Sequence, residues 1–261
     1  MSNIKSIYCH NPSPIQLEHI LRWLVHRNYR FLSADELYHC LTDKHTTEGK
    51  LAFMSLDDAW RSNLELMPII EKYNVPITIF VPVEPVKSGN YWWEYVPREE
   101  REAIKRLDYK EFCHHVTKER RTKTLERSCM TAEEISLLAR HPLVSIQSHT
   151  LTHPILTCLP DELLEREINE SKRQLEAIIG QEVNYFSYPN GTYTTREIEA
   201  ARKAYKMAFT TNLHYISLND DILALPRIEI TGRRYRDLLK IYNIWPTIRK
   251  IGRTILFKPQ Y

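Results

Sequence analysis

The sequence predicts an α/β protein in which parallel strands form a distorted (β/α) barrel that is wrapped by helices. Short apolar runs alternate along the chain with amphipathic segments that begin at helix caps. A length of 261 residues fits one large domain of this kind. Polar side chains that can bind metal follow several of the apolar runs, which is where β/α folds carry their chemistry.

Seven apolar runs predict strands, and each is short enough to be a buried strand of a parallel sheet. They lie at residues 5–8, 51–55, 77–81, 144–147, 185–187, 207–211 and 224–228.

Three helix starts are marked by capping boxes, at Ser33, Thr131 and Thr194, each with Glu three residues later. In such a box the side chains satisfy the first free backbone N–H groups of the helix. Apolar periodicity predicts further helices over 15–27, 61–73 and 161–179.

The composition supports a folded core and excludes several classes of protein. Hydrophobic residues make up 43% and aromatic residues 10%, so disorder is not expected. The five cysteines are odd in number and lack Cys-x-x-Cys spacing, which argues against a disulfide framework or a thiolate zinc site. The N-terminus has no apolar stretch of signal-peptide length, and no run reaches the roughly 18 apolar residues of a membrane span. We therefore expect a cytoplasmic protein without a nucleic-acid partner.

The C-terminal residues 232–261 predict a separate basic tail. Eight Lys or Arg and one acid lie between Thr231 and Tyr261, whereas the rest of the chain has 28 basic and 32 acidic residues. Isoleucines at 244, 248, 251 and 255 have helical spacing, with basic residues opposite. Such a helix either closes the barrel or lies on an anionic membrane surface, peripheral to the inner membrane.

Two carboxylates and two imidazoles predict a metal site. Asp57 and Asp58 follow one predicted strand, and His149 and His153 follow another. A metal ion that performs hydrolysis usually has three protein ligands and an open position for water, so one Asp and two His suffice. On a helical turn, residues four apart place both imidazoles on one side. Because the chain turns at a strand end, one Asp can bind the metal while the other remains a general base.

These residues resemble the motifs of the polysaccharide deacetylase family, which has the NodB homology fold and is also known as carbohydrate esterase family 4. Leu56-Asp57-Asp58 resembles the family's Thr-Phe-Asp-Asp-Gly motif, and His149 to Pro154 matches its His-(Ser/Thr)-x-x-His-Pro motif. Residues 186–191 resemble its third motif, and weaker similarity extends over residues 5–231.

The resemblance implies a role for each of these residues. Asp58, His149 and His153 would bind a divalent metal, most simply Zn²⁺, although other first-row ions suit the same ligands. Asp57 would be the base that activates water, and the Pro189-Asn190 segment would help to hold the oxyanion of an acetylated saccharide substrate.

Three departures from the family pattern affect the expected site. Ala59 replaces the motif glycine, at a turn where glycine is conformationally favoured. Ser187 stands where many members carry an Arg that orients the base, so either Arg227 reaches the base from another strand or the base is held less firmly. The histidine that serves as general acid in the family is absent, and His10 and His214 are the predicted substitutes.

Residues 87–130 predict an insertion within the catalytic domain, which we place at residues 1–231. It begins with a cluster of aromatic residues that includes Trp92, Trp93 and Tyr95. These rings either stack on a sugar or attach the insertion to the barrel.

Three functions are compatible with these observations. The leading hypothesis is a metal-dependent hydrolase that removes acetyl groups from an N-acetylated sugar of a polysaccharide or glycan precursor. The second keeps the metal and changes the bond to that of a cyclic amide or ureide, as in relatives of this fold. The third is a glycan-binding relative with little catalysis. The sequence does not choose an oligomeric state.

Overall fold

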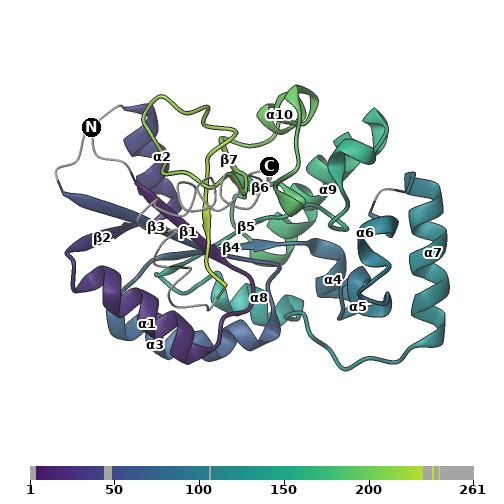
Figure 1. Ribbon diagram of the computed structural model, residues 1–261, viewed down its shortest axis with the longest axis horizontal. Coiled ribbons are helices and arrows are strands. Elements are labelled where there is room, and N and C mark those ends of the chain that lie inside the picture. The colour runs from purple at the N-terminus through teal and green to yellow at the C-terminus, as the bar shows by residue number, and fades with distance from the viewer. Residues whose placement is uncertain (1–3, 44–48, 106, 232–236, 238–240, 242–261) are drawn as a thin grey trace, which may run out of the picture.

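The computed structural model describes residues 4–43, 49–105 and 107–231, together with Asp237 and Ile241. Within these residues, eight parallel strands form one sheet that curls into a barrel-like shape surrounded by helices (Figure 1). The strand order is β7-β6-β5-β4-β3-β1-β8, and β2 pairs with β3 outside this path. The strands are β1 (Lys5–Cys9), β2 (Tyr29–Leu32), β3 (Lys50–Asp57), β4 (Ile77–Val81), β5 (Val144–Ser148), β6 (Tyr185–Ser187), β7 (Met207–Phe209) and β8 (Ile228–Glu229).

One segment near β8 connects the two ends of the strand order. Ile228 pairs with Ile7 of β1, while Leu225 forms a parallel bridge to Phe209 of β7. The sheet therefore curls back on itself, and the carboxyl ends of its strands lie around a common rim. The α/β barrel predicted from the sequence is confirmed.

Helices cover the outside of the sheet, and α1 and α3 pack side by side along it (Figure 1). The capping boxes predicted at Ser33, Thr131 and Thr194 are all present, each with reciprocal side-chain hydrogen bonds. The helices around the sheet are α1 (Pro14–Val25), α2 (Ala34–Thr42), α3 (Met67–Tyr73), α8 (Ala132–Leu138), α9 (Asp161–Ile179) and α10 (Thr195–Arg202), with short 3₁₀ turns η1 (Arg61–Leu66), η2 (Leu156–Cys158) and η3 (Pro189–Gly191).

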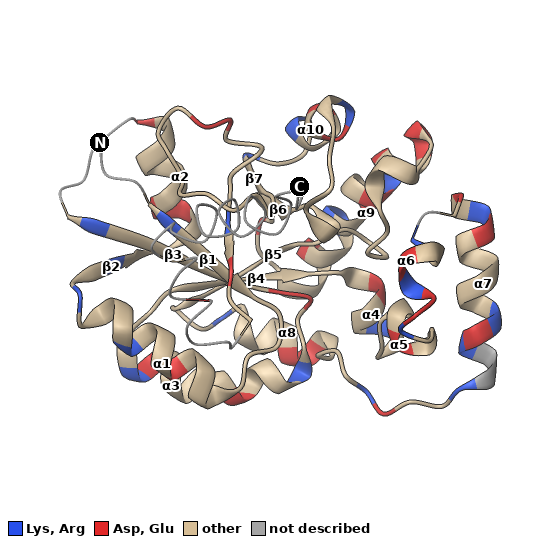
Figure 2. Ribbon diagram, viewed as in Figure 1, with Lys and Arg blue, Asp and Glu red and all other residues tan. Residues whose placement is uncertain are grey.

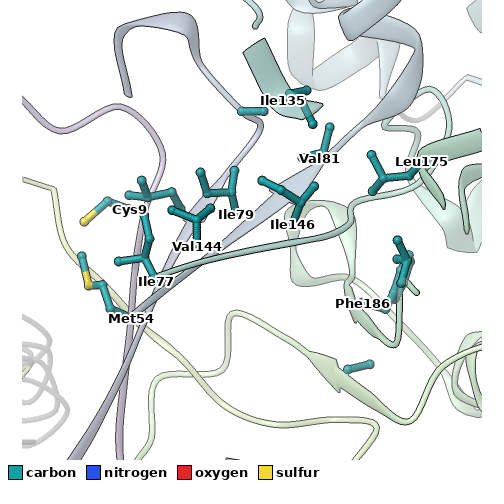
Figure 3. Packing of buried hydrophobic residues seen from close by; sticks show 14 of the residues in the cluster. Cys9, Met54, Ile77, Ile79, Val81, Ile135, Val144, Ile146, Leu175 and Phe186 are labelled. Carbon is teal, nitrogen blue, oxygen red and sulfur yellow. The ribbon is translucent and has the colours of Figure 1, made fainter. Parts of the chain in front are cut away.

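The strands divide the apolar residues between two clusters because successive side chains point to opposite faces of a sheet. In β3, Ala52, Met54 and Leu56 join the cluster under the helices, and Leu51 and Phe53 join the cluster inside the barrel. Figure 3 shows part of the first cluster, where side chains of β4 and β5 lie near Ile135 of α8 and Leu175 of α9. The same alternation places Ser55 and Asp57 on the barrel's inner face.

The insertion predicted at residues 87–130 forms a helical lobe beside the barrel (Figure 1). The lobe follows β4 and begins at Val83, earlier than the predicted insertion; it contains α4 (Val83–Ser88), α5 (Trp92–Tyr95), α6 (Arg101–Ile104) and α7 (Tyr109–Thr122). A small core of its own includes Trp92, Val96, Ile104 and Val116. The lobe is therefore attached to the end of the sheet that carries the candidate site.

The structure corrects several predicted elements. Strand β2 was not predicted, and the predicted strands at 207–211 and 224–228 are instead Met207–Phe209 and Ile228–Glu229. The single helix expected over 61–73 is divided into η1 and α3, with Pro68 in the first turn of α3. Proline has no N–H to donate and is favoured in a first turn, which explains why a new helix begins there.

Most of the predicted tail, 232–261, lies outside the described residues. Of the tail, Asp237 and Ile241 are described, and both are buried. The backbone carbonyl of Ile241 accepts hydrogen bonds from Lys5 Nζ, at 2.7 Å, and from the Tyr215 hydroxyl. No helix in the described part of the chain has the length and apolar character needed to cross a bilayer. The domain boundary, the membrane contact and the cytoplasmic location stay predictions.

Candidate active site

Three side chains predicted as metal ligands converge at the rim of the barrel. Asp58 Oδ1 lies 3.4 Å from His153 Nε2 and 3.7 Å from His149 Nε2. All three side chains are buried, and their ligand atoms lie within 4.8 Å of one another. Asp58 Oδ1 is buried without a hydrogen-bond partner among the described residues. An orphaned carboxylate oxygen that faces two imidazole nitrogens fits a divalent cation.

The two imidazoles are neutral in this environment. Burial lowers the pKa of His149 to about 4, against an opposing effect of the nearby Asp57 carboxylate. Burial likewise lowers the pKa of His153 to about 3. His149 Nδ1 lies 2.7 Å from the Ser187 carbonyl and donates to it, so Nε2 carries the lone pair that faces Asp58. Neutral imidazoles are the form that binds metal.

The loop that carries both histidines is not the helical turn that the four-residue spacing predicted. Thr150 and His153 have positive φ values of 71° and 59°, and no helix covers residues 149–153. The His153 N–H donates to Thr150 Oγ1 at 3.0 Å, which tightens the loop. The rings still meet, with centroids 4.8 Å apart, because the backbone reverses between them.

The turn after β3 separates the two aspartates as predicted. Asp58 and Ala59 have φ values of 79° and 56°, a left-handed region that favours glycine. The Tyr91 hydroxyl donates to the Asp58 carbonyl at 2.7 Å, and Trp60 Nε1 donates to Asp58 Oδ2 at 3.3 Å. These contacts hold a strained turn in which alanine occupies the position of the family's glycine.

Asp57 ends β3 and pairs with Arg227. Both carboxylate oxygens of Asp57 accept hydrogen bonds from the guanidinium, at 2.7 and 2.8 Å. Arg227 is fully buried. It also donates to the Ser187 hydroxyl at 2.7 Å and to the Thr210 carbonyl at 3.0 Å, and it lies 4.3 Å from the centre of the Tyr8 ring. Arg227, which directly precedes β8, therefore holds the candidate base Asp57, which is the first of the two alternatives drawn from the sequence.

Two opposing effects set the ionisation of Asp57. Burial acts to raise the pKa of this carboxyl, but the charge and hydrogen bonds of Arg227 outweigh burial and hold the pKa below its usual range. Asp57 is thus a carboxylate at neutral pH. Each oxygen keeps a second lone pair after accepting from Arg227.

A cavity of about 600 Å³ opens above these residues. Its lining includes the metal triad, Asp57, His10, Asn190, Trp92 and Trp93. Asn190 has a positive φ of 55° and precedes Gly191, whose N–H donates to the Tyr188 carbonyl at 2.9 Å. Pro189 is buried and is not among the lining residues.

The structure does not bring His214 to this cavity. Strand β7 ends at Phe209, earlier than predicted, and the chain continues into an irregular segment. His214 is exposed there, and its Nδ1 lies 2.8 Å from the backbone carbonyl of Tyr215. Of the two histidines suggested as substitutes for the missing acid, only His10 lines the cavity.

The two tryptophans of the insertion have different environments. Trp92 is buried, donates its Nε1–H to the His153 carbonyl at 3.1 Å and packs against Phe112 of α7. Trp93 is half-buried and stacks on Tyr91, and its ring centroid lies 4.7 Å from that of His153. Trp92 therefore attaches the insertion to the metal loop, and Trp93 presents an aromatic surface to the cavity.

The sequence analysis missed Glu167, which supports the histidine loop from α9. Its carboxylate accepts hydrogen bonds from the N–H groups of Leu151 and Thr152, at 2.9 and 2.8 Å, and from the Thr152 hydroxyl at 2.7 Å. Glu167 is buried, and it lies three residues after Leu164, which is also buried on α9. A carboxylate at this spacing on the apolar face of a helix was the signal that could have revealed it.

The comparison with protein families agrees with this geometry. A family described as Polysaccharide deacetylase matches residues 44–208. The chain belongs to the polysaccharide deacetylase family. The family comprises hydrolases that act on carbon–nitrogen amide bonds.

Relatives and solved structures extend the similarity over most of the chain. A Bacillus subtilis protein named as a polysaccharide deacetylase, YxkH, is 25% identical over 218 residues, which cover 83% of this chain and 64% of that protein. The chain thus spans somewhat less than two thirds of the length of that relative.

Two solved structures share the fold. The Streptococcus pyogenes deacetylase PplD, solved in complex with acetate, has a TM-score of 0.70 and 21% identity, over 92% of this chain and 97% of that chain. IcaB from Ammonifex degensii has a TM-score of 0.68 and 18% identity, over 94% and 98% of the two chains. Both likenesses confirm the predicted NodB-type barrel.

Proposed function

We propose that this protein is a metal-dependent hydrolase that removes acetyl groups from an N-acetylated sugar of a polysaccharide or glycan precursor. The observation that carries the proposal is the buried Asp58–His149–His153 triad, with its unpartnered carboxylate oxygen, beside an ionised Asp57. Membership of the polysaccharide deacetylase family supports the choice of substrate.

The triad would hold the metal, and zinc is the ion we favour. One carboxylate and two imidazoles also suit other first-row ions. When bound, the ion would lower the pKa of a water molecule toward about 7 and polarise the acetyl carbonyl. The hydrogen bond from His149 to the Ser187 carbonyl fixes the ring and its tautomer before any ion binds.

Asp57 would accept the proton of the attacking water. It is ionised, it lines the cavity next to the triad, and Arg227 fixes its orientation through two hydrogen bonds. Because Arg227 lowers its basicity, Asp57 suits a water whose own acidity has been raised.

The remaining steps require a hydrogen-bond donor to the oxyanion and a proton for the departing amine. We assign the first to the backbone near Asn190, which lines the cavity in a left-handed turn. We assign the second to His10, whose exposed side chain lines the same cavity. Acetate and a free amine would be the products.

The test is acetate release from N-acetylated oligosaccharides after chelation and reconstitution with single metals. We expect turnover that returns with zinc or another first-row ion and is lost in the Asp57→Asn variant. Turnover of small cyclic amides without acetate release would instead support the second sequence-based hypothesis. Saccharide binding without turnover under any metal would support the glycan-binding alternative.

A further inference from the structure

The helical insertion places basic side chains along one wall of the candidate active-site cavity. Arg98, Arg101 and Lys105 all line it; Arg101 begins α6, Arg98 lies just before this helix and Lys105 directly follows it. Figure 2 shows basic residues on α6, in the lobe next to α4 and α5. We call these three residues the basic wall.

The acids of the same stretch are arranged differently. Glu99 and Glu100 are exposed and are not among the lining residues, and Glu100 lies 3.8 Å from His115 of α7. Glu102 does line the cavity, and its carboxylate pairs with Lys105 at 2.8 Å. The ion pair offsets one positive charge, and the charges of two arginines are left on the wall.

The guanidinium groups of these arginines have unused donors among the described residues. Arg101 donates its Nε–H to the Val96 carbonyl at 3.2 Å, which positions the side chain and leaves its two terminal nitrogens available. Arg98 is exposed at the cavity edge. A planar guanidinium with free N–H groups matches the oxygens of a phosphate or carboxylate.

Besides Glu102, the carboxylates that line the cavity are Asp57, Asp58 and Glu229. Asp57 is paired with Arg227, and Asp58 faces the two imidazoles of the metal triad. Trp93 lines the same cavity as the basic wall and packs on His153. A saccharide whose acetyl group reaches the triad would thus extend past Trp93 toward the arginines.

We propose that the substrate is anionic, with a phosphate or carboxylate group close to the N-acetylated sugar and bound by Arg98 and Arg101. This inference rests on the proposed function for the position of the acetyl group. It adds a class of substrate, an acidic saccharide, that the triad does not assign.

Matched monosaccharides test the inference. The probes are the neutral methyl glycoside of N-acetylglucosamine, N-acetylglucosamine 1-phosphate for the phosphate and N-acetylmuramic acid for the carboxylate. Acetate release gives kcat/KM for each, and calorimetry gives each Kd independently of turnover. We expect a higher kcat/KM and a lower Kd for at least one anionic probe than for the neutral one. The anionic probe with the larger effect shows whether the bound group is a phosphate or a carboxylate.

Variants of the wall provide the decisive comparison. In Arg98→Gln/Arg101→Gln, the preference for the anionic over the neutral probe should fall about tenfold or more, since hydrogen bonds to charged groups are lost. Arg101→Lys should retain part of that preference. The control is Lys110→Gln, which removes an exposed charge of α7 outside the cavity lining.

Three outcomes would overturn the proposal: no preference for either anionic probe, an undiminished preference in the double variant, or an equal fall in the Lys110→Gln control. If the wild type releases acetate neither from these probes nor from the N-acetylated oligosaccharides, the proposed function fails. In that case the Kd values, which do not depend on turnover, still show whether the protein binds the anionic probes more tightly than the neutral one.

Discussion

Arg227 binds both carboxylate oxygens of Asp57, at 2.7 and 2.8 Å, although 170 residues separate the two in the chain. Both side chains are buried, and Arg227 also contacts Ser187 of β6. The pair therefore connects β3, β6 and the start of β8 across the inside of the barrel. It keeps the candidate base ionised and fixes its direction.

Removal of the arginine should be strongly destabilising. Arg227→Met would leave the buried Asp57 carboxylate without its partner, at a cost of about 3–5 kcal/mol in the free energy of unfolding. Urea denaturation measures this loss. The double variant Asp57→Asn/Arg227→Met should recover part of the stability because no buried charge remains. Strictly additive effects of the two substitutions would show that the pair is not coupled.

Asp57→Asn should separate catalysis from metal binding. Loss of the general base should lower kcat by about 10²- to 10⁴-fold, whereas Asp58, His149 and His153 stay in place to bind the ion. Acetate-release kinetics and elemental analysis of the same sample measure the two properties. A variant with wild-type kcat would remove Asp57 from the proposed mechanism.

Metal binding should depend on the triad. We expect His153→Gln to lower metal affinity by at least about tenfold, since one of three protein ligands is lost. Isothermal titration of the chelated protein with zinc measures the affinity. His39→Gln is the matched control because that ring is exposed and lies on α2. Equal affinity in His153→Gln and wild type would contradict the assigned site.

The metal-free protein should lose stability in mild acid. Burial lowers the pKa of His149 to about 4 and of His153 to about 3, from 6.5. Below pH 6.5 the unfolded chain therefore binds more protons than the folded one, and the free energy of unfolding decreases as the pH is lowered. At pH 5 the cost is on the order of 2 kcal/mol for each histidine.

Urea denaturation of the chelated protein at pH 7 and pH 5 measures this effect. The variant His149→Gln/His153→Gln lacks both titrating groups and should show a smaller loss between the two pH values. An equal loss in both proteins would mean that other groups cause the acid sensitivity.

Glu167 should act on the metal site through the loop that it holds. Glu167→Met removes both accepting oxygens and should leave the N–H groups of Leu151 and Thr152 without their acceptor, at a cost of about 1–3 kcal/mol. Zinc affinity should fall as the histidine loop loosens. Glu165→Met on the exposed face of α9 is the control for both measurements. Unchanged affinity would confine Glu167 to a purely structural role.

Local sequence signals were sufficient for much of the fold. The capping boxes at Ser33, Thr131 and Thr194 satisfy helix N–H groups with side chains three residues away, so nearby residues determine them. The strand β4 and the helix α9 also match their predicted bounds, since both are long or strongly apolar segments. Strand β2 was missed because it is short and its first residues are partly exposed.

The candidate site residues could be selected from the sequence where they lie in short motifs. The metal triad and Asp57 were found in this way, and the structure brings all four to one cavity. His214 was misplaced because its position depends on where β7 ends. Glu167 was missed because its partners are backbone N–H groups in another segment, which no local pattern reveals.

The sequence by itself determined the alternation of strands and helices, the family, and the residue types of the candidate metal site. Only the tertiary structure decided how those residues are used: that Arg227 replaces a missing arginine, that a left-handed loop and not a helix orients the histidines, and that the insertion carries basic residues to the cavity. The physical reason is the range of the interactions. Helix caps and strand alternation depend on neighbours in the chain, whereas charge pairing and cavity walls depend on segments that meet only after the sheet has curled.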